Sequence, residues 1–174
     1  MVVALALVPA WAPAARASRP AGSAPCALRA EPGPGSRTVP PDLIAGALWV
    51  GVPGDDPGFA QAQPGRDLAV KTPVIVRARH RAVVRVAAAQ AGHAGLLYSA
   101  RAQRARHVGG ADRAVRFRAC PSGQPRFSDG GMVGPYTFWA GAVMADAPRC
   151  VRLETFVDGV RRRDLRIPVG RPCD

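Results

Sequence analysis

Few side chains of this sequence could carry out acid–base, nucleophilic or metal chemistry. The three histidines are His80, His93 and His107, and no two of them have the spacing of a metal-binding pair. Ser128 and Asp129 lie in an FSDGG run that faintly resembles a serine-protease loop, but their order is reversed and no nucleophile elbow is present. Acidic residues are scattered, and no phosphate-binding loop occurs. We therefore predict no catalytic residue, no metal site and no cofactor.

The four cysteines are the second set of reactive residues. They are Cys26, Cys120, Cys150 and Cys173, an even number without the C-x-x-C spacing of zinc and redox sites. In an exported protein this pattern predicts two disulfides. Each should stabilise the fold by about 3–4 kcal/mol, because it restricts the unfolded chain.

The direction of the expected strands ranks the possible pairings. Cys120 ends one strand, an antiparallel strand runs back, and Cys150 follows at the opposite end of the sheet. The next hairpin returns the chain to that end at Cys173, so Cys150–Cys173 is the preferred pair and Cys26–Cys120 remains. The loop after Cys120 is long, so Cys120–Cys150 with Cys26–Cys173 stays open.

Arginine supplies nearly all of the basic charge, since Lys71 is the one lysine and the formal net charge is +12. Alternating arginines on neighbouring strands could merge into a surface that binds phosphate or carboxylate groups. The candidate residues are Arg77, Arg79, Arg81, Arg116, Arg118, Arg161, Arg162 and Arg163. Aromatic residues make up 6% of the chain and do not interleave with these arginines, which argues against specific nucleic-acid binding. A GC-rich genome also enriches arginine, so a solvated surface without a partner is the competing interpretation.

The first part of the chain has the features of a delivery signal. Residues 1–17 hold a short apolar run and end in Ala15-Arg16-Ala17, which matches the cleavage pattern of a signal peptide. An uncleaved anchor is the alternative, but the run is short and contains prolines. We expect a secreted or envelope protein with no transmembrane span in its mature form.

The rest divides into a lead-in and one domain. Residues 18–41 are rich in Pro, Gly, Ala and Arg without periodicity, so we expect a flexible lead-in. Residues 42–174 are long enough for a single domain with its own core.

That domain has the pattern of short strands joined by turns. Expected strands cover residues 43–52, 72–78, 82–88, 95–100, 113–120, an apolar run from Tyr136, residues 151–157 and residues 161–169. Residues 79–81 form a polar turn, and a helix is the rival interpretation for residues 82–88. No amphipathic helix stands out, so we predict an all-β fold, an antiparallel, immunoglobulin-like sandwich of about seven to eight strands.

Three local signals refine this prediction. In residues 113–120, Val115 and Phe117 alternate with arginines and should face the core. Gly141 interrupts an apolar run and indicates a bulge or a close backbone approach. Asp158-Gly159 indicates a type I′ hairpin turn. The aromatic group Tyr136, Phe138 and Trp139 could form a sugar platform, but packing in the core is favoured.

Several segments are similar to a family of small secreted, cysteine-containing β-proteins of actinobacteria that have no assigned function. The segments are VIVRARHRAVVRVAAAQAGHAGLLY, FRACP, GPYTFWAGAVMADAPRC and IPVGRPC, which together span residues 71–173. The resemblance implies export and paired cysteines at Cys120, Cys150 and Cys173. It carries no catalytic or binding residue.

Together these patterns predict an exported, non-catalytic binding module with an arginine-rich surface. Its partner would be an acidic envelope polymer or another protein. The alternatives are a purely structural or accessory exported domain and a hydrolase whose triad no motif reveals.

Overall fold

The computed structural model describes residues 21–30, 42–52, 64–121, 123 and 134–174. Within these ranges the chain forms strands, turns and four 3₁₀ helices, and no α-helix. The expected signal peptide at residues 1–17 and the FSDGG run lie outside them. No helix of the described ranges is long and apolar enough to cross a membrane.

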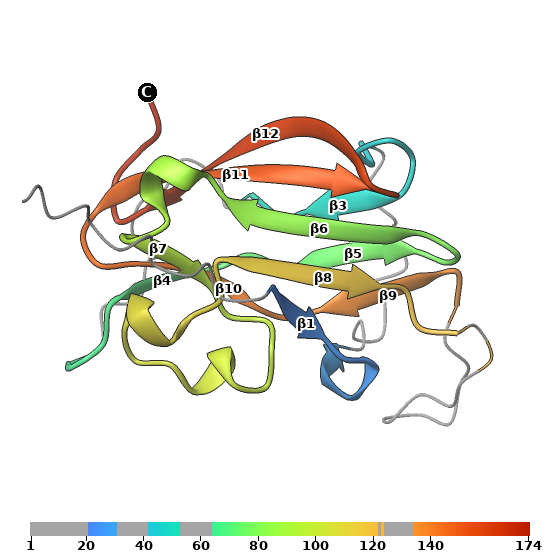
Figure 1. Ribbon diagram of the computed structural model, residues 1–174, viewed down its shortest axis with the longest axis horizontal. Helices are drawn as coiled ribbons and strands as arrows, with labels where there is room; N and C mark the ends of the chain where they lie inside the picture. Colours follow the sequence, from blue (N-terminus) through green and yellow to red (C-terminus); the bar gives the residue numbers. More distant parts are fainter. Residues whose placement is uncertain (1–20, 31–41, 53–63, 122, 124–133) are drawn as a thin grey trace, which may run out of the picture.

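The described strands form three sheets (Figure 1). The five-stranded sheet, in the order β1-β8-β6-β11-β12, consists of β1 (Gly22–Ala24), β8 (Ala114–Arg118), β6 (Arg81–Val86), β11 (Arg149–Val157) and β12 (Val160–Val169). The four-stranded sheet, β2-β9-β5-β3, consists of β2 (Arg29–Ala30), β9 (Tyr136–Trp139), β5 (Val74–Arg77) and β3 (Leu48–Val50). The three-stranded sheet, β4-β10-β7, consists of β4 (Leu68–Lys71), β10 (Ala142–Ala145) and β7 (Ala94–Leu96). The 3₁₀ helices are η1 (Cys26–Leu28), η3 (Ala88–Gln90), η4 (Ala102–Arg104) and η5 (Val108–Gly110).

The predicted all-β class is confirmed. Every strand pair of the described residues is antiparallel except β1 with β8, which is parallel. The described residues hold twelve strands, more than the seven to eight expected. One reason is that apolar runs are poor guides to strand ends: only Leu48–Val50 of residues 43–52 is a strand, because Ala45 and Gly46 turn the chain at positive φ.

Buried side chains of all three sheets form the core, and those of the five-stranded and four-stranded sheets meet within it. Val115 and Phe117 of β8 are buried while Arg116 and Arg118 are exposed, as the alternation predicted. The Phe117 ring meets the buried Trp139 ring of β9 edge to face, with 5.4 Å between centroids. This contact joins the two sheets at the centre of the core.

The polar turn at residues 79–81 carries the chain from one sheet to the other. Both predicted strands form, as β5 and β6, and the helix interpretation is wrong for the second of them. They do not pair with each other: β5 lies in the four-stranded sheet and β6 in the five-stranded sheet. Arg79 makes the crossing with φ at 69°.

Gly141 marks a close approach, as its position in an apolar run predicted. The run divides there into β9 and β10, which belong to different sheets. A methyl group on Gly141 would overlap the ring of Tyr98, so only glycine fits beside that ring. Tyr98 is fully buried, which raises the pKa of its hydroxyl, and it donates a hydrogen bond to the Thr72 carbonyl oxygen.

The longest strands, β11 and β12, form the predicted hairpin. Asp158 and Gly159 both have positive φ, 51° and 84°, as a type I′ turn requires. Further along, a bulge places Arg162 and Arg163 opposite Thr155, whose hydroxyl donates to the Arg163 carbonyl oxygen at 2.6 Å.

Of the expected flexible lead-in over residues 18–41, the structure describes residues 21–30, which form β1, η1 and β2. Within it, β1 pairs with β8 and β2 pairs with β9, on either side of η1. The sequence of this segment has no periodicity, so it did not predict these strands. Each forms because the neighbouring strand, β8 or β9, offers backbone groups for pairing at the edge of its sheet. The indole N–H of Trp139 also donates to the Pro25 carbonyl oxygen, at 3.3 Å.

The two predicted disulfides are present. Cys26 is bonded to Cys120 and Cys150 to Cys173, the pairs that strand direction favoured. The first bond ties η1 to the end of β8, and the second ties the start of β11 to the chain after β12. The lead-in is therefore held both by backbone pairing and by a covalent bond.

Candidate functional site

The outer face of the five-stranded sheet is rich in arginine. Because side chains alternate along a strand, the exposed arginines of its four longest strands lie on the face opposite the core. We call this set the arginine face: Arg81, Arg85, Arg116, Arg118, Arg152, Arg161 and Arg166. All of these side chains come from β6, β8, β11 and β12, which lie side by side (Figure 1).

Acidic side chains neutralise the part of the arginine face on β11 and β12. The Glu154 carboxylate is nearly buried and contacts Arg85 at 2.5 Å and Arg161 at 3.4 Å. Asp164 contacts Arg161 at 3.0 Å and Arg152 at 3.1 Å. The hydrogen bond and the charge of Asp164 hold the pKa of the Arg161 guanidinium above its ordinary range.

The bulge in β12 makes this neutralisation possible. Arg161 and Asp164 are three residues apart, so in a regular strand they would point to opposite faces. The extra residue opposite Thr155 brings both onto the outer face, where Asp164 lies opposite Glu154 and Arg161 opposite Phe156.

The arginines at the start of β6 and on β8 have no such partners. In the described ranges, no carboxylate lies within ion-pair distance of the guanidinium groups of Arg81, Arg116 or Arg118. Arg81 lies directly opposite Arg118 in the antiparallel register, and Arg116 lies opposite Val83. Positive charge is therefore concentrated on this edge of the face.

A cleft of about 670 Å³ opens at the end of this charged edge, beside the Cys26–Cys120 disulfide. Its charged wall consists of Arg79, Arg81 and Arg118, together with the His80 ring. Its other lining residues are Ala24, Pro25, Cys26, Ala78, Ala119, Cys120 and Pro121. Among the described residues that line it, none is acidic.

The structure brings together four of the eight arginines predicted from the sequence. Arg81, Arg116 and Arg118 share the unneutralised edge, and Arg79 lies beside them in the turn. Arg77 ends β5 in the other sheet. The remaining three are on β12: Arg161 is ion-paired, Arg163 lies 3.9 Å from Asp42, and Arg162 is exposed in the bulge.

Each of the three histidines has an aspartate partner, which the sequence did not reveal. The Nδ1 atom of His80 lies 2.7 Å from Asp158, that of His93 lies 2.7 Å from Asp146, and that of His107 lies 3.1 Å from Asp67. These pairs join residues that are 78, 53 and 40 positions apart.

A histidine paired with an aspartate is also found in acid–base catalytic sites. Here the pairs connect segments that are far apart in the sequence, which is a structural role. In the described ranges, the hydrogen bonds of the three rings reach aspartates and no hydroxyl or thiol. His80 joins the β5–β6 turn to the β11–β12 turn through Asp158. The backbone N–H of Arg81 and the His80 ring both donate to Asp158, and they lower the pKa of its carboxyl. The His93 ring, followed by Arg149, has the same effect on Asp146.

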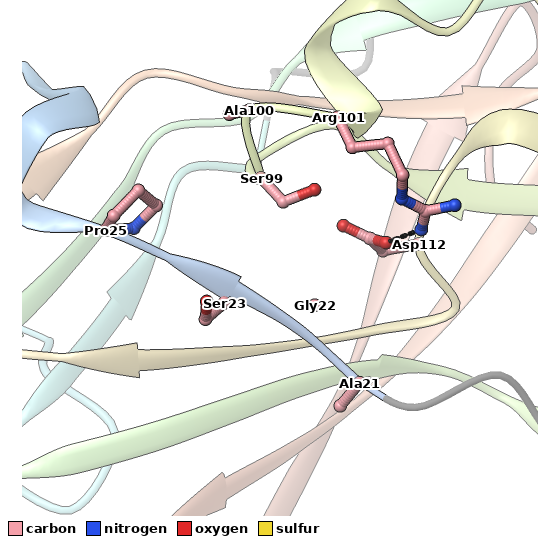
Figure 2. A pocket seen from close by; sticks show the side chains of 8 residues that line it. All are labelled: Ala21, Gly22, Ser23, Pro25, Ser99, Ala100, Arg101 and Asp112. Atoms are coloured by element: carbon pink, nitrogen blue, oxygen red, sulfur yellow. Dashed lines mark hydrogen bonds and ion pairs between the residues drawn. The ribbon is translucent and has the colours of Figure 1, made fainter.

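A second pocket, of about 610 Å³, lies between β1 and the loop around η4 (Figure 2). Ser23 and Ser99 line it from opposite sides, and Arg101 forms an ion pair with the buried Asp112. The Oδ2 atom of Asp112 has no hydrogen-bond partner in the described ranges. Gly22 covers that atom so closely that a methyl group on Gly22 would overlap it. This pocket therefore lies where β1 packs against the loop around η4, and Gly22 covers the Oδ2 atom of Asp112 so that a ligand does not reach it.

The aromatic group at β9 does not form a single platform. Trp139 and Thr137 point into the core, while Tyr136 and Phe138 are half-buried on the other face of the strand. The side chains of β9 thus alternate between the two faces of the sheet. The prediction that the aromatic residues pack in the core is confirmed for Trp139.

The described ranges contain no group of three histidine, cysteine or acidic side chains that could hold a metal ion. No family model, curated protein or solved structure matches the chain. The site therefore has to be interpreted from its own chemistry. One feature of the sequence could have predicted the acidic partners on β11 and β12. Arg152 and Glu154 are two residues apart, so they lie on the same face of a strand, a pattern typical of charge pairing with neighbouring strands.

Proposed function

We propose that this protein is an exported, non-catalytic module that binds an acidic polymer of the cell envelope. The observation that carries the proposal is the cluster of Arg81, Arg116 and Arg118 on β6 and β8, which has no acidic partner in the described ranges. Elsewhere on the same face, carboxylates neutralise the arginines. Guanidinium groups left unpaired on one edge favour a partner that supplies negative charge from outside.

Three observations support export. The two disulfides favour an oxidising compartment. Residues 1–17 have the pattern of a cleavable signal peptide. The resemblance to secreted actinobacterial proteins, which we propose as the family, points the same way. Mass spectrometry of protein recovered from the culture medium tests this: a chain that begins at Ser18 is expected, and retention of residues 1–17 inside the cell contradicts it.

We also propose that the five- and four-stranded sheets form a sandwich of the immunoglobulin-like kind. The shared core and the ring contact between Phe117 and Trp139 support this arrangement. A crystal structure in which the strand directions of the two sheets differ by much more than about 30° would contradict it.

Salt-dependent retention on immobilised heparin, an acidic polysaccharide, tests the binding function. The double variant Arg116→Gln/Arg118→Gln should elute at clearly lower sodium chloride than the unmodified protein, because two unpaired cations leave the surface. The matched control is Arg104→Gln/Arg106→Gln, which removes the same charge from an exposed loop elsewhere. The control should elute close to the unmodified protein.

Two results would overturn the proposal. Retention that does not weaken with salt would exclude an electrostatic contact. Equal losses in the two double variants would show that net charge alone, and not this edge of the sheet, determines binding.

A further inference from the structure

We propose that the cleft beside the Cys26–Cys120 disulfide binds a single tetrahedral oxyanion group, a phosphate or a sulfate. The inference rests on the proposed function and deepens it, because the group would be a substituent of the acidic polymer that lies along β6 and β8. The cleft would receive that substituent while the arginine face follows the rest of the polymer.

The first argument is the composition of the cleft. Three arginines line it, Arg79 from the β5–β6 turn, Arg81 from β6 and Arg118 from β8, and no acidic residue of the part of the chain that the structure describes does. Each guanidinium presents a fork of N–H donors that matches phosphate and carboxylate oxygens. Donors from three separate backbone positions can therefore reach one anion from more than one side.

The second argument is the register of β6 and β8. Arg81 lies directly opposite Arg118, and like charges at opposite positions of an antiparallel pair destabilise the sheet. Four residues along the same strand, Arg85 lies opposite Ala114 and contacts Glu154, so no like charges oppose each other there. An anion between Arg81 and Arg118 would relieve the repulsion.

The third argument is that Asp158, whose carboxylate is hydrogen-bonded to two residues that line the cleft, already has its partners. Asp158 accepts from the His80 ring at 2.7 Å through Oδ2, and from the Arg81 backbone N–H at 3.0 Å through Oδ1. Both oxygens are thus used, and the Arg81 guanidinium lies outside ion-pair distance of them. Asp158 holds the His80 ring against the cleft and leaves the arginine side chains available.

The number of donors in the cleft favours a tetrahedral oxyanion over a carboxylate. A carboxylate brings one charge and two oxygens, whereas a sulfate ester brings three acceptor oxygens with one charge and a phosphate monoester three acceptor oxygens with up to two charges. Three guanidinium groups are better matched by these oxyanions. The walls beside them are rigid, since Pro25 and Pro121 flank the disulfide.

Titrations of the ¹⁵N-labelled protein with sodium sulfate, sodium phosphate and sodium acetate test this proposal. Sulfate and phosphate should shift the amide signals of residues 78–81 and 118–121 in a saturable manner, and acetate should bind much more weakly. The tighter of the two dianions shows whether a sulfated or a phosphorylated polymer is the source of the group.

Matched variants locate the site. Arg81→Gln or Arg118→Gln should weaken binding of the dianion about tenfold, as expected for the loss of a charge-assisted hydrogen bond. Arg104→Gln is the control, because Arg104 is an exposed arginine in η4 that belongs neither to the arginine face nor to the lining of the cleft. It should change the dissociation constant less than twofold.

Shifts that grow linearly and match those caused by sodium chloride at equal ionic strength would overturn the inference, as would equal affinity for acetate. Equal losses in Arg104→Gln and Arg118→Gln would overturn it as well. These outcomes differ from failure on heparin: a protein that is retained there but binds no dianion keeps the proposed function and loses the cleft. A protein that binds sulfate in the cleft but is not retained keeps the cleft and loses the polymer.

Discussion

Asp158 links two turns of the fold through a single side chain. It occupies the first central position of the β11–β12 turn with positive φ, a conformation that Asp and Asn tolerate well. Its two oxygens accept from the Arg81 backbone and from His80. The β5–β6 and β11–β12 turns, which are far apart in the sequence, are thereby held at one end of the five-stranded sheet.

This carboxylate should make stability fall in acid. The pKa of Asp158 is lower in the folded protein than its ordinary value of 3.8, so its contribution is fully present above that value and is lost as the pH falls through the folded pKa. The Asp158→Asn variant keeps a residue suited to the turn and cannot ionise. Urea unfolding between pH 6 and pH 2.5 should therefore show a shallower loss of stability in the variant. Identical pH profiles would contradict the role assigned to Asp158.

Among the elements, strand β1 depends most on fine steric fit. It is three residues long and lies parallel to β8 at the edge of the sheet. Gly22 packs over the buried Asp112, and the disulfide at Cys26 fixes the chain directly after the strand. So short a strand is held by its surroundings more than by its own pairing.

Replacing Gly22 by Ala should loosen this strand. The added methyl group would overlap the Asp112 carboxylate, and overpacking of this kind costs about 1–3 kcal/mol. Hydrogen exchange should show faster exchange in β1 and β8, together with a lower unfolding free energy. Gly92→Ala is the matched control, since a methyl group on Gly92 meets nothing within 4 Å. Equal effects of the two substitutions would contradict the steric account.

The elements also show where sequence reasoning succeeds. The strand at residues 113–120, the hairpin at Asp158-Gly159 and the close approach at Gly141 depend on local alternation, turn chemistry or an unusual glycine, and all three are present. The pairing of β1 and β2 was missed, because it depends on open sheet edges elsewhere in the fold. The same limit applies to the site. Alternation in the sequence predicts that arginines share one face of the sheet, but it does not predict the bulge that brings Asp164 to the same face.

For the whole molecule, two disulfides of different reach tie the chain together. The first closes a separation of 94 residues between the lead-in and β8, and the second closes 23 residues around the β11–β12 hairpin. With a formal net charge of +12, the folded protein carries considerable self-repulsion. Restricting the unfolded chain offsets part of that cost.

Removing the two bonds separately should therefore destabilise the protein unequally. Chain-entropy arithmetic gives about 4.7 kcal/mol for Cys26→Ala/Cys120→Ala and about 3.4 kcal/mol for Cys150→Ala/Cys173→Ala. The first variant should also lose sulfate binding in the cleft, because that disulfide is part of its wall, while the second should keep it. Urea unfolding measures the first difference, and sulfate titration below the unfolding transition measures the second. A larger loss of stability in the Cys150–Cys173 variant would contradict the loop-length argument, and loss of sulfate binding in both folded variants would show that the cleft depends on general stability and not on its own disulfide.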